Sequence, residues 1–283
     1  MPSASRARYR VLVAQTRPRF GEVARNVDEA LRLVDRALVR GGGADLVVLP
    51  ELFHTGYVFR SRAEARALAE DARRGPTVAT LAAFARARRL TVVAGLCERA
   101  GRALHNSAVW VGPQGFGGVY RKVHLFDQEK RWFEPGRDPW PVFRAGAARV
   151  GVLVCFDWRF PEAARALALE GADVLAHPSN LVMKPCQEAM RTRALENRVF
   201  AATANRVGED RRPGARLSFT GRSQVVDPSG AVLWRAGPRA PAARVVEIDL
   251  ALARDKSVTA RNDLFRDRHP RLYAALTRAT RSR

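Results

Sequence analysis

The chain has 283 residues, of which 47% are hydrophobic, including 13 Phe and 5 Trp, so it can bury a sizeable core and is not a disordered protein. No apolar stretch approaches the ~20 residues of a membrane span, and the N-terminus lacks a signal-peptide pattern, so we expect no membrane partner. Three cysteines make a poor disulfide framework, which favours a cytoplasmic location.

The net charge of +21 raises the question of a nucleic-acid partner. Arginines occur in nearly every segment and no nucleic-acid-binding motif is present, so we expect no specific nucleic acid. Only four of the 49 basic residues are lysines: Lys122, Lys130, Lys184 and Lys256. Because a lysine ammonium is a compact charge with a tunable pKa, a lysine kept in such an arginine-rich chain is a candidate for a specific role.

Strands and helices alternate along the first half of the chain. Apolar periodicity predicts, in chain order, a strand at 9–16, a helix at 22–40, a strand at 45–49, helices at 63–72 and 76–89, and a strand at 91–97. Segments 103–111 and 118–121 are typical of a hairpin that turns at the glycines Gly115–Gly117.

The second half repeats this order. We expect a strand at 149–154, a helix at 162–170, a strand at 173–176, a helix at 187–198, a strand at 200–207, and further strands after 217 with a turn at Asp227–Gly230. The runs GGGADLVVLPE (41–51) and LEGADVLAHPSN (169–180) both end a helix with Gly, enter a short strand through Ala-Asp and leave it through Pro. This pattern predicts an internally duplicated α/β domain over 1–283 with two facing sheets. The polar tail, from about 255 to 283, is expected to pack on a partner subunit.

Polar, reactive side chains follow four of the predicted strands. Glu51 comes after DLVVLP, Lys122 closes VYRK, Cys155 comes after VGVLV, and Asn180 follows DVLAHPS. In open α/β sheets, ligands bind beyond the carboxyl ends of the strands, so these positions predict a site.

Cys155 is the sharpest of these candidates. It ends a buried strand and precedes a helix whose first turn suits Pro161, and a thiol near a helix N-terminus or a cation is easily activated. The alternative is an inert buried cysteine, which fits Cys97 well and also applies to Cys186. Glu51 would be a general base for the thiol or an ordinary loop carboxylate, and Lys122 an active-site cation or a solvated lysine.

Three segments resemble the signature blocks of the nitrilase superfamily of carbon–nitrogen hydrolases. They are ELFHTGY (51–57), YRKVHLFD (120–127) and CFDWRFPE (155–162), and they occur in the family's order, each holding one member of its Glu-Lys-Cys triad. The similarity continues through HPSNLVMK (177–184) and RALENRVFAATANRVG (193–208) and covers nearly the whole chain. The resemblance implies a four-layer-forming α-β-β-α sandwich that associates into a homodimer or larger homo-oligomer.

The resemblance also implies a mechanism without a cofactor. Cys155 attacks the substrate carbon, Glu51 moves the proton, and Lys122 with the backbone N–H of Phe156 stabilises the developing charge. The family's second glutamate falls on Glu129 by its spacing, with Glu134 as the alternative.

Two other chemistries compete with this interpretation. Cys-His catalysis would need a histidine, for which His124 is the nearest candidate, although Glu51 already supplies a base. The five histidines show no paired metal-ligand spacing, so we expect no metal.

The substrate is less well specified than the triad. The same triad serves amides, nitriles and N-carbamoyl compounds, so it does not separate them. Small aliphatic amides rank first, because amidase is the commoner activity among single-domain relatives of this length, followed by small aliphatic nitriles and then N-carbamoyl compounds. An inactive family member that acts as a binding protein is the non-enzymatic alternative. Phe53, Tyr57 and Trp158 either line the pocket or pack in the core. Arg159 either binds a substrate carboxylate or braces Asp157, and Asn180 is a further pocket candidate.

Overall fold

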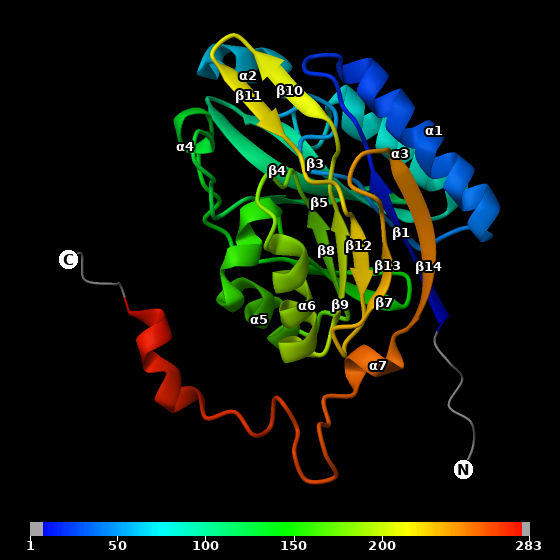
Figure 1. The fold of residues 1–283 in the computed structure, drawn as a ribbon, viewed down its shortest axis with the longest axis vertical. Helices are drawn as coiled ribbons and strands as arrows, with labels where there is room; N and C mark the ends of the chain where they lie inside the picture. The colour runs from blue at the N-terminus through cyan, green and yellow to red at the C-terminus, as the bar shows by residue number, and fades with distance from the viewer. Residues whose placement is uncertain (1–7, 279–283) are drawn as a thin grey trace.

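In the computed structural model, which describes residues 8 to 278, two six-stranded sheets lie face to face with helices on their outer sides (Figure 1). The strands of the first sheet are, in spatial order, β14 (Ala242–Asp249), β1 (Arg8–Gln15), β2 (Leu46–Val48), β3 (Thr91–Ala100), β4 (Ala103–Gly112) and β5 (Gly115–Arg121). The three central strands β1, β2 and β3 are parallel, and β14 and β4 flank them antiparallel.

The second sheet repeats this layout. Its strands are β6 (Val142–Ala145), β7 (Ala148–Val152), β8 (Val174–Pro178), β9 (Phe200–Ala204), β12 (Gln224–Val226) and β13 (Val232–Arg235). Here β7, β8 and β9 are parallel, with β6 and β12 antiparallel on either side. The duplication predicted from the two Ala-Asp segments is therefore present, since these segments lead into β2 and β8, the equivalent central strands.

Apolar side chains that alternate between the two faces of each strand allow four layers to pack. In β1, Val11 and Val13 join the apolar core between the two sheets, whereas Leu12 and Ala14 join the cluster under the helices. Successive side chains of a strand point to opposite faces, so a sheet buried on both faces needs an apolar run of this kind. The result is the predicted α-β-β-α sandwich.

The helices cover the two outer faces. Helices α1 (Val23–Gly41) and α3 (Pro76–Arg88) pack on the first sheet, and α5 (Pro161–Leu169) and α6 (Cys186–Asn197) on the second (Figure 1). The remaining short elements are α2 (Arg62–Leu68), α4 (Glu129–Trp132), α7 (Ala251–Arg254), the 3₁₀ turns η1 (Cys155–Arg159) and η2 (Pro270–Thr277), and the hairpin strands β10 (Glu209–Arg212) and β11 (Ala215–Ser218). Among residues 8 to 278, no helix is long and apolar enough to cross a membrane.

The predicted turn at Gly115–Gly117 was wrong. Strand β4 ends at Gly112 and β5 begins at Gly115, so the chain turns at residues 113 and 114. Gly117 and Gly118 lie inside β5, where an added Cβ would come within 2.4 and 2.2 Å of the Trp110 ring. These glycines make room for a tryptophan, and they do not form the turn.

The last segment of the chain leaves the body of the sandwich after α7 (Figure 1). Phe265 still packs against the core, but no residue of η2 is buried. The predicted polar tail from about 255 thus contains an exposed apolar turn, and its last residues, 279 to 283, lie outside the described part of the chain.

Candidate active site

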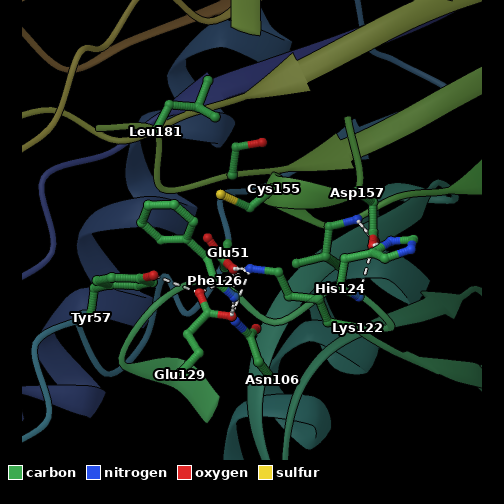
Figure 2. A network of polar contacts seen from close by, with 12 residues as sticks. Glu51, Tyr57, Asn106, Lys122, His124, Phe126, Glu129, Cys155, Asp157 and Leu181 are labelled. Carbon is green, nitrogen blue, oxygen red and sulfur yellow. Dashed lines mark hydrogen bonds and ion pairs between the residues drawn. The ribbon is translucent and has the colours of Figure 1, made fainter. Parts of the chain in front are cut away.

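The side chains that follow the central strands meet in one buried place. Glu51 follows β2, Lys122 follows β5, Cys155 follows β7 and Asn180 follows β8, and all four are buried. Figure 2 shows the Cys155 sulfur directed toward the Glu51 carboxylate and the Lys122 ammonium. Positions about seventy and thirty residues apart in the sequence are therefore brought together, because the carboxyl ends of strands from both sheets open on the same side.

Lys122 bridges two carboxylates. Its Nζ donates to Glu51 Oε1 at 2.7 Å and to Glu129 Oε1 at 2.9 Å, and both carboxylates are buried. A lysine ammonium has three N–H donors, so one is left for a ligand. The Asn106 side chain also donates to Glu51 Oε1, at 2.7 Å, which leaves Glu51 Oε2 without a partner among the described residues.

Glu129, and not Glu134, lies against Lys122. Glu129 begins the short helix α4, and its carboxylate also accepts from the Tyr57 hydroxyl at 2.5 Å and from the Phe126 N–H at 3.1 Å (Figure 2). Glu134 forms a surface ion pair with Arg62 at 2.9 Å instead.

The backbone around Cys155 is held in an unusual conformation. Cys155 has φ +42°, a left-handed value that is costly for a residue with a Cβ. Asp157 accepts from the Val154 N–H at 2.9 Å, and its own N–H donates to the Val154 carbonyl at 3.1 Å. Asp157 further accepts from the Tyr120 hydroxyl at 2.8 Å, so the turn is tied to β5.

His177 supports the same turn from β8. Its Nε2 lies 2.9 Å from the Cys155 carbonyl oxygen, which can only accept, so Nε2 carries the proton. Nδ1 then accepts from the Thr203 hydroxyl at 3.1 Å. Burial lowers the pKa of His177 to about 4, which keeps this ring neutral at neutral pH.

Gly95 on β3 allows the first sheet to position Glu51. Its N–H donates to the Pro50 carbonyl at 3.1 Å, and a Cβ at this position would lie 2.3 Å from the Glu51 Cα. Only glycine permits this approach of strand and loop.

Burial and charge set the protonation of the site. Burial raises the pKa of Glu51 and of Cys155, and the neighbouring Lys122 opposes both shifts. A backbone hydrogen bond from Asn180 also lowers the pKa of Cys155, without reversing the shift. For Lys122, burial lowers the pKa, but Glu129 and Glu51 together raise it above its ordinary value. The thiol of Cys155 is therefore neutral at rest, and it lies beside the ammonium of Lys122.

His124 does not face Cys155. Its Nδ1 lies 2.8 Å from Asp157 Oδ1, and its ring stacks on Phe160 with centroids 3.5 Å apart. The geometry therefore favours a carboxylate base over a Cys-His pair. Within residues 8 to 278, no group of three or more His, Cys, Asp or Glu side chains is arranged to hold a metal ion.

The predicted pocket residues other than Tyr57 lie in three different surroundings. Phe53 and Trp158 are buried in apolar clusters, Phe53 under α1 and α3, and Trp158 in the same cluster as Cys155. Arg159 is exposed and lies over the Trp158 ring, and it is not among the partners of Asp157. Asn180 is buried, and neither side-chain amide atom has a hydrogen-bond partner among residues 8 to 278.

A cavity of about 600 Å³ is lined by Tyr57 and Glu129, two residues at the edge of the buried polar cluster. It is lined by residues from 57–60, 127–133 and 213–217, the last being the tip of the β10–β11 hairpin, and we call it the hairpin cavity.

Several supporting residues were not predicted from the sequence. Asn106 lies in the middle of β4, and Asp157 and His177 lie beside predicted site residues. The signal for Asn106 was the polar run His105-Asn106-Ser107 within an otherwise apolar strand. A buried strand tolerates such residues only where they have hydrogen-bond partners.

Comparison with known proteins identifies a family. The sequence model described as Carbon-nitrogen hydrolase matches residues 10–256. A nitrilase of Pyrococcus abyssi is 47% identical over 93% of this chain and 98% of its own length. An (R)-stereoselective amidase of a Pseudomonas species is 37% identical over 90% of this chain and 88% of its own. An N-carbamoylputrescine amidase of Arabidopsis thaliana is 31% identical, over 90% and 91%.

Solved structures give the same result. An amidase of Nesterenkonia from the nitrilase superfamily has a TM-score of 0.78 at 28% identity, over 97% of this chain and 98% of its own. A structure of a mutant of that amidase carries the acetamide moiety of fluoroacetamide, covalently added at its active-site cysteine.

Proposed function

Because the chain belongs to the carbon–nitrogen hydrolase family, we propose that it hydrolyses small aliphatic amides to the acid and ammonia, with Cys155 as the nucleophile. One observation carries this proposal. Glu51, Lys122, Glu129 and Cys155 form a single buried cluster, in which one oxygen of Glu51 and one N–H of Lys122 remain available. A base and a cation are thus both present beside the thiol.

The first step is attack by the thiolate. A lone thiolate would add a third negative charge beside Glu51 and Glu129, which is one reason why the pKa of Cys155 is raised, after burial. Transfer of the thiol proton to Glu51 avoids this, because the charge moves and does not increase. The sulfur bonds to the carbonyl carbon, and the C=O electron pair moves to the oxygen.

Lys122 and the Phe156 backbone stabilise that oxygen. The remaining N–H of Lys122 and the N–H of Phe156, in the first turn of η1, are the donors. Loss of one such donor typically costs ~3–4 kcal/mol of barrier stabilisation.

The second half of the reaction returns the enzyme to its resting state. Glu51 gives its proton to the substrate nitrogen as the C–N bond breaks, and ammonia leaves a thioester on Cys155. Water then attacks the thioester and gives a proton to Glu51. The C–S bond breaks, the acid departs, and the proton returns to the sulfur.

The unpartnered atoms favour an amide over a nitrile. Glu51 Oε2 and Asn180 Oδ1 are buried acceptors, and Asn180 Nδ2 is a buried donor, without partners among the described residues. An amide supplies two N–H donors and a carbonyl acceptor, whereas a nitrile nitrogen only accepts. Because buried acceptors without donors are costly, the amide matches this site better.

A nitrile remains the second candidate, because the relative that is 47% identical carries the name nitrilase. The test compares substrates that differ only in the reacting group, butyramide and butyronitrile, with N-carbamoylputrescine as a third probe. We expect ammonia release with the highest kcat/KM for butyramide, and loss of all turnover in Cys155→Ala. A higher kcat/KM for butyronitrile would instead support the nitrilase activity, and turnover by Cys155→Ala would contradict both.

A further inference from the structure

A fully buried ion pair lies outside the cluster just described. Arg206 Nη2 donates to Asp210 Oδ1 at 2.8 Å and Nη1 to Asp210 Oδ2 at 3.1 Å, and both residues are buried. Burial lowers the pKa of Arg206, and Asp210 opposes that shift. Because burying two charges costs free energy that their attraction barely offsets, such a pair indicates a specific structural demand.

The other hydrogen-bond partners of Asp210 indicate what this structural demand is. Its Oδ2 also accepts from the N–H groups of Tyr57, at 3.0 Å, and Val58, at 3.3 Å. Asp210 lies in β10 of the hairpin, so it connects the hairpin to the loop that follows Glu51 and β2. The Arg206 guanidinium meanwhile lies 4.0 Å from the centroid of Phe219, whose ring meets Tyr57 edge to face.

Tyr57 links the Arg206–Asp210 pair to the active site. With its backbone held by Asp210 and its ring by Phe219, the position of the hydroxyl is fixed. That hydroxyl donates to Glu129 at 2.5 Å, and Glu129 in turn accepts from Lys122 (Figure 2). Figure 2 shows the Tyr57 hydroxyl reaching Glu129 from the side opposite Asn106.

We propose that the Arg206–Asp210 pair is a positioning element for Lys122, acting through the backbone of Tyr57 and the Tyr57–Glu129 hydrogen bond. Neither residue of the pair touches the reacting atoms. This inference rests on the proposed function, since it assigns a role in that same reaction. It requires that loss of the pair lowers kcat more than it changes KM, because the ammonium acts on charge that develops only in the transition state.

The test is a double-mutant cycle with Asp210→Asn and Tyr57→Phe. In Asp210→Asn the new side-chain amide has one acceptor oxygen, whereas the carboxylate of Asp210 has two. It therefore cannot accept hydrogen bonds from both Arg206 and the loop. Tyr57→Phe removes only the hydroxyl. Each variant is expected to lower kcat on butyramide by roughly tenfold or more, with KM changed by less than about threefold. If both act along one path, the double variant loses no more than the single variants.

Asp173→Asn is the matched control. Asp173 is also buried, accepts from a backbone N–H, that of Arg149, and pairs with an arginine, Arg254, but it precedes β8 at the end away from the site. This variant is expected to melt at a lower temperature with kcat unchanged. If Asp210→Asn does not fold, Arg206→Lys replaces it, because lysine keeps the cation but cannot hold Asp210 with a planar fork.

The possible results distinguish failure of this inference from failure of the proposed function. A folded pair variant with a kcat equal to that of Asp173→Asn, or losses that multiply in the double variant, would overturn the inference and leave the proposed function intact. Absence of turnover by the unaltered protein on every amide and nitrile would overturn the proposed function itself.

Discussion

The protonation state of Cys155 depends on burial and on the neighbouring Glu51. Burial raises the pKa of both groups, and each carboxylate near Cys155 makes a thiolate harder to form. Lys122 reduces this effect without removing it, because it is shared between Glu51 and Glu129. A thiol that stays protonated at rest needs a base within the site, and Glu51 Oε2 is the free oxygen for this task.

The pH dependence of kcat/KM follows from the raised pKa of Glu51. The reaction needs the carboxylate form, and a raised pKa means that this form is lost at a higher pH than for an ordinary glutamate. Activity should therefore fall with decreasing pH with a midpoint above 4.5, the ordinary value. A pH profile of butyramide hydrolysis checks this, and a midpoint at or below 4.5 in a protein that is still folded would contradict it.

At the scale of elements, the site was predictable where an apolar strand ends in a polar residue. The strands β2, β7 and β8 were predicted from short apolar runs, and Glu51, Cys155 and Asn180 followed from them. What could not be predicted depends on pairings between distant segments. Strand β14 pairs with β1 from the other end of the chain, and the polar sequence of the β10–β11 hairpin gave no strand pattern.

The direction of the side chains was the second feature that could not be predicted from the sequence. Phe53 and Trp158 lie two and three positions from Glu51 and Cys155, and both are buried in apolar clusters. Leu52 and Cys155 both have positive φ, so the loops bend sharply and closeness in sequence does not place side chains on one side. The hydroxyl of Tyr57, by contrast, reaches Glu129.

Substitution of Gly95 tests whether the close approach of β3 to the loop positions Glu51. In Gly95→Ala the new methyl would overlap the Glu51 backbone, which must shift, so we expect a loss of ~1–3 kcal/mol in stability and a fall in kcat/KM. Gly112→Ala is the control, because its Cβ would find its nearest neighbour at 3.8 Å. Chemical denaturation and butyramide kinetics measure both effects, and equal behaviour of the two variants would refute the role of Gly95.

For the whole molecule, the segment after α7 is the feature that a single chain leaves unexplained. Its 3₁₀ turn η2 buries no residue, and Leu272 and Leu276 are 79% and 66% exposed. Apolar side chains grouped on a projecting segment are typical of a contact with another subunit. A second copy of this chain is the partner that we expect, in a homodimer or larger homo-oligomer.

Substitution of these leucines tests that expectation. Leu272→Asp combined with Leu276→Asp should shift the protein toward the monomer in light scattering after size exclusion, because charges replace the apolar contact. Val39→Asp is the control, since Val39 is 75% exposed on α1 in the body of the molecule. If the leucine variant keeps the oligomeric state of the unaltered protein, the tail is not the contact.

We propose that Cys155 forms a covalent bond to the substrate carbon with the help of Glu51. Mass spectrometry of the intact protein, after acid quenching during turnover of butyramide, measures this directly. We expect a butyryl adduct that maps to the peptide containing Cys155 and is absent in Cys155→Ala. Butyramide hydrolysis at an undiminished rate by Cys155→Ala, or an adduct on another residue, would contradict it.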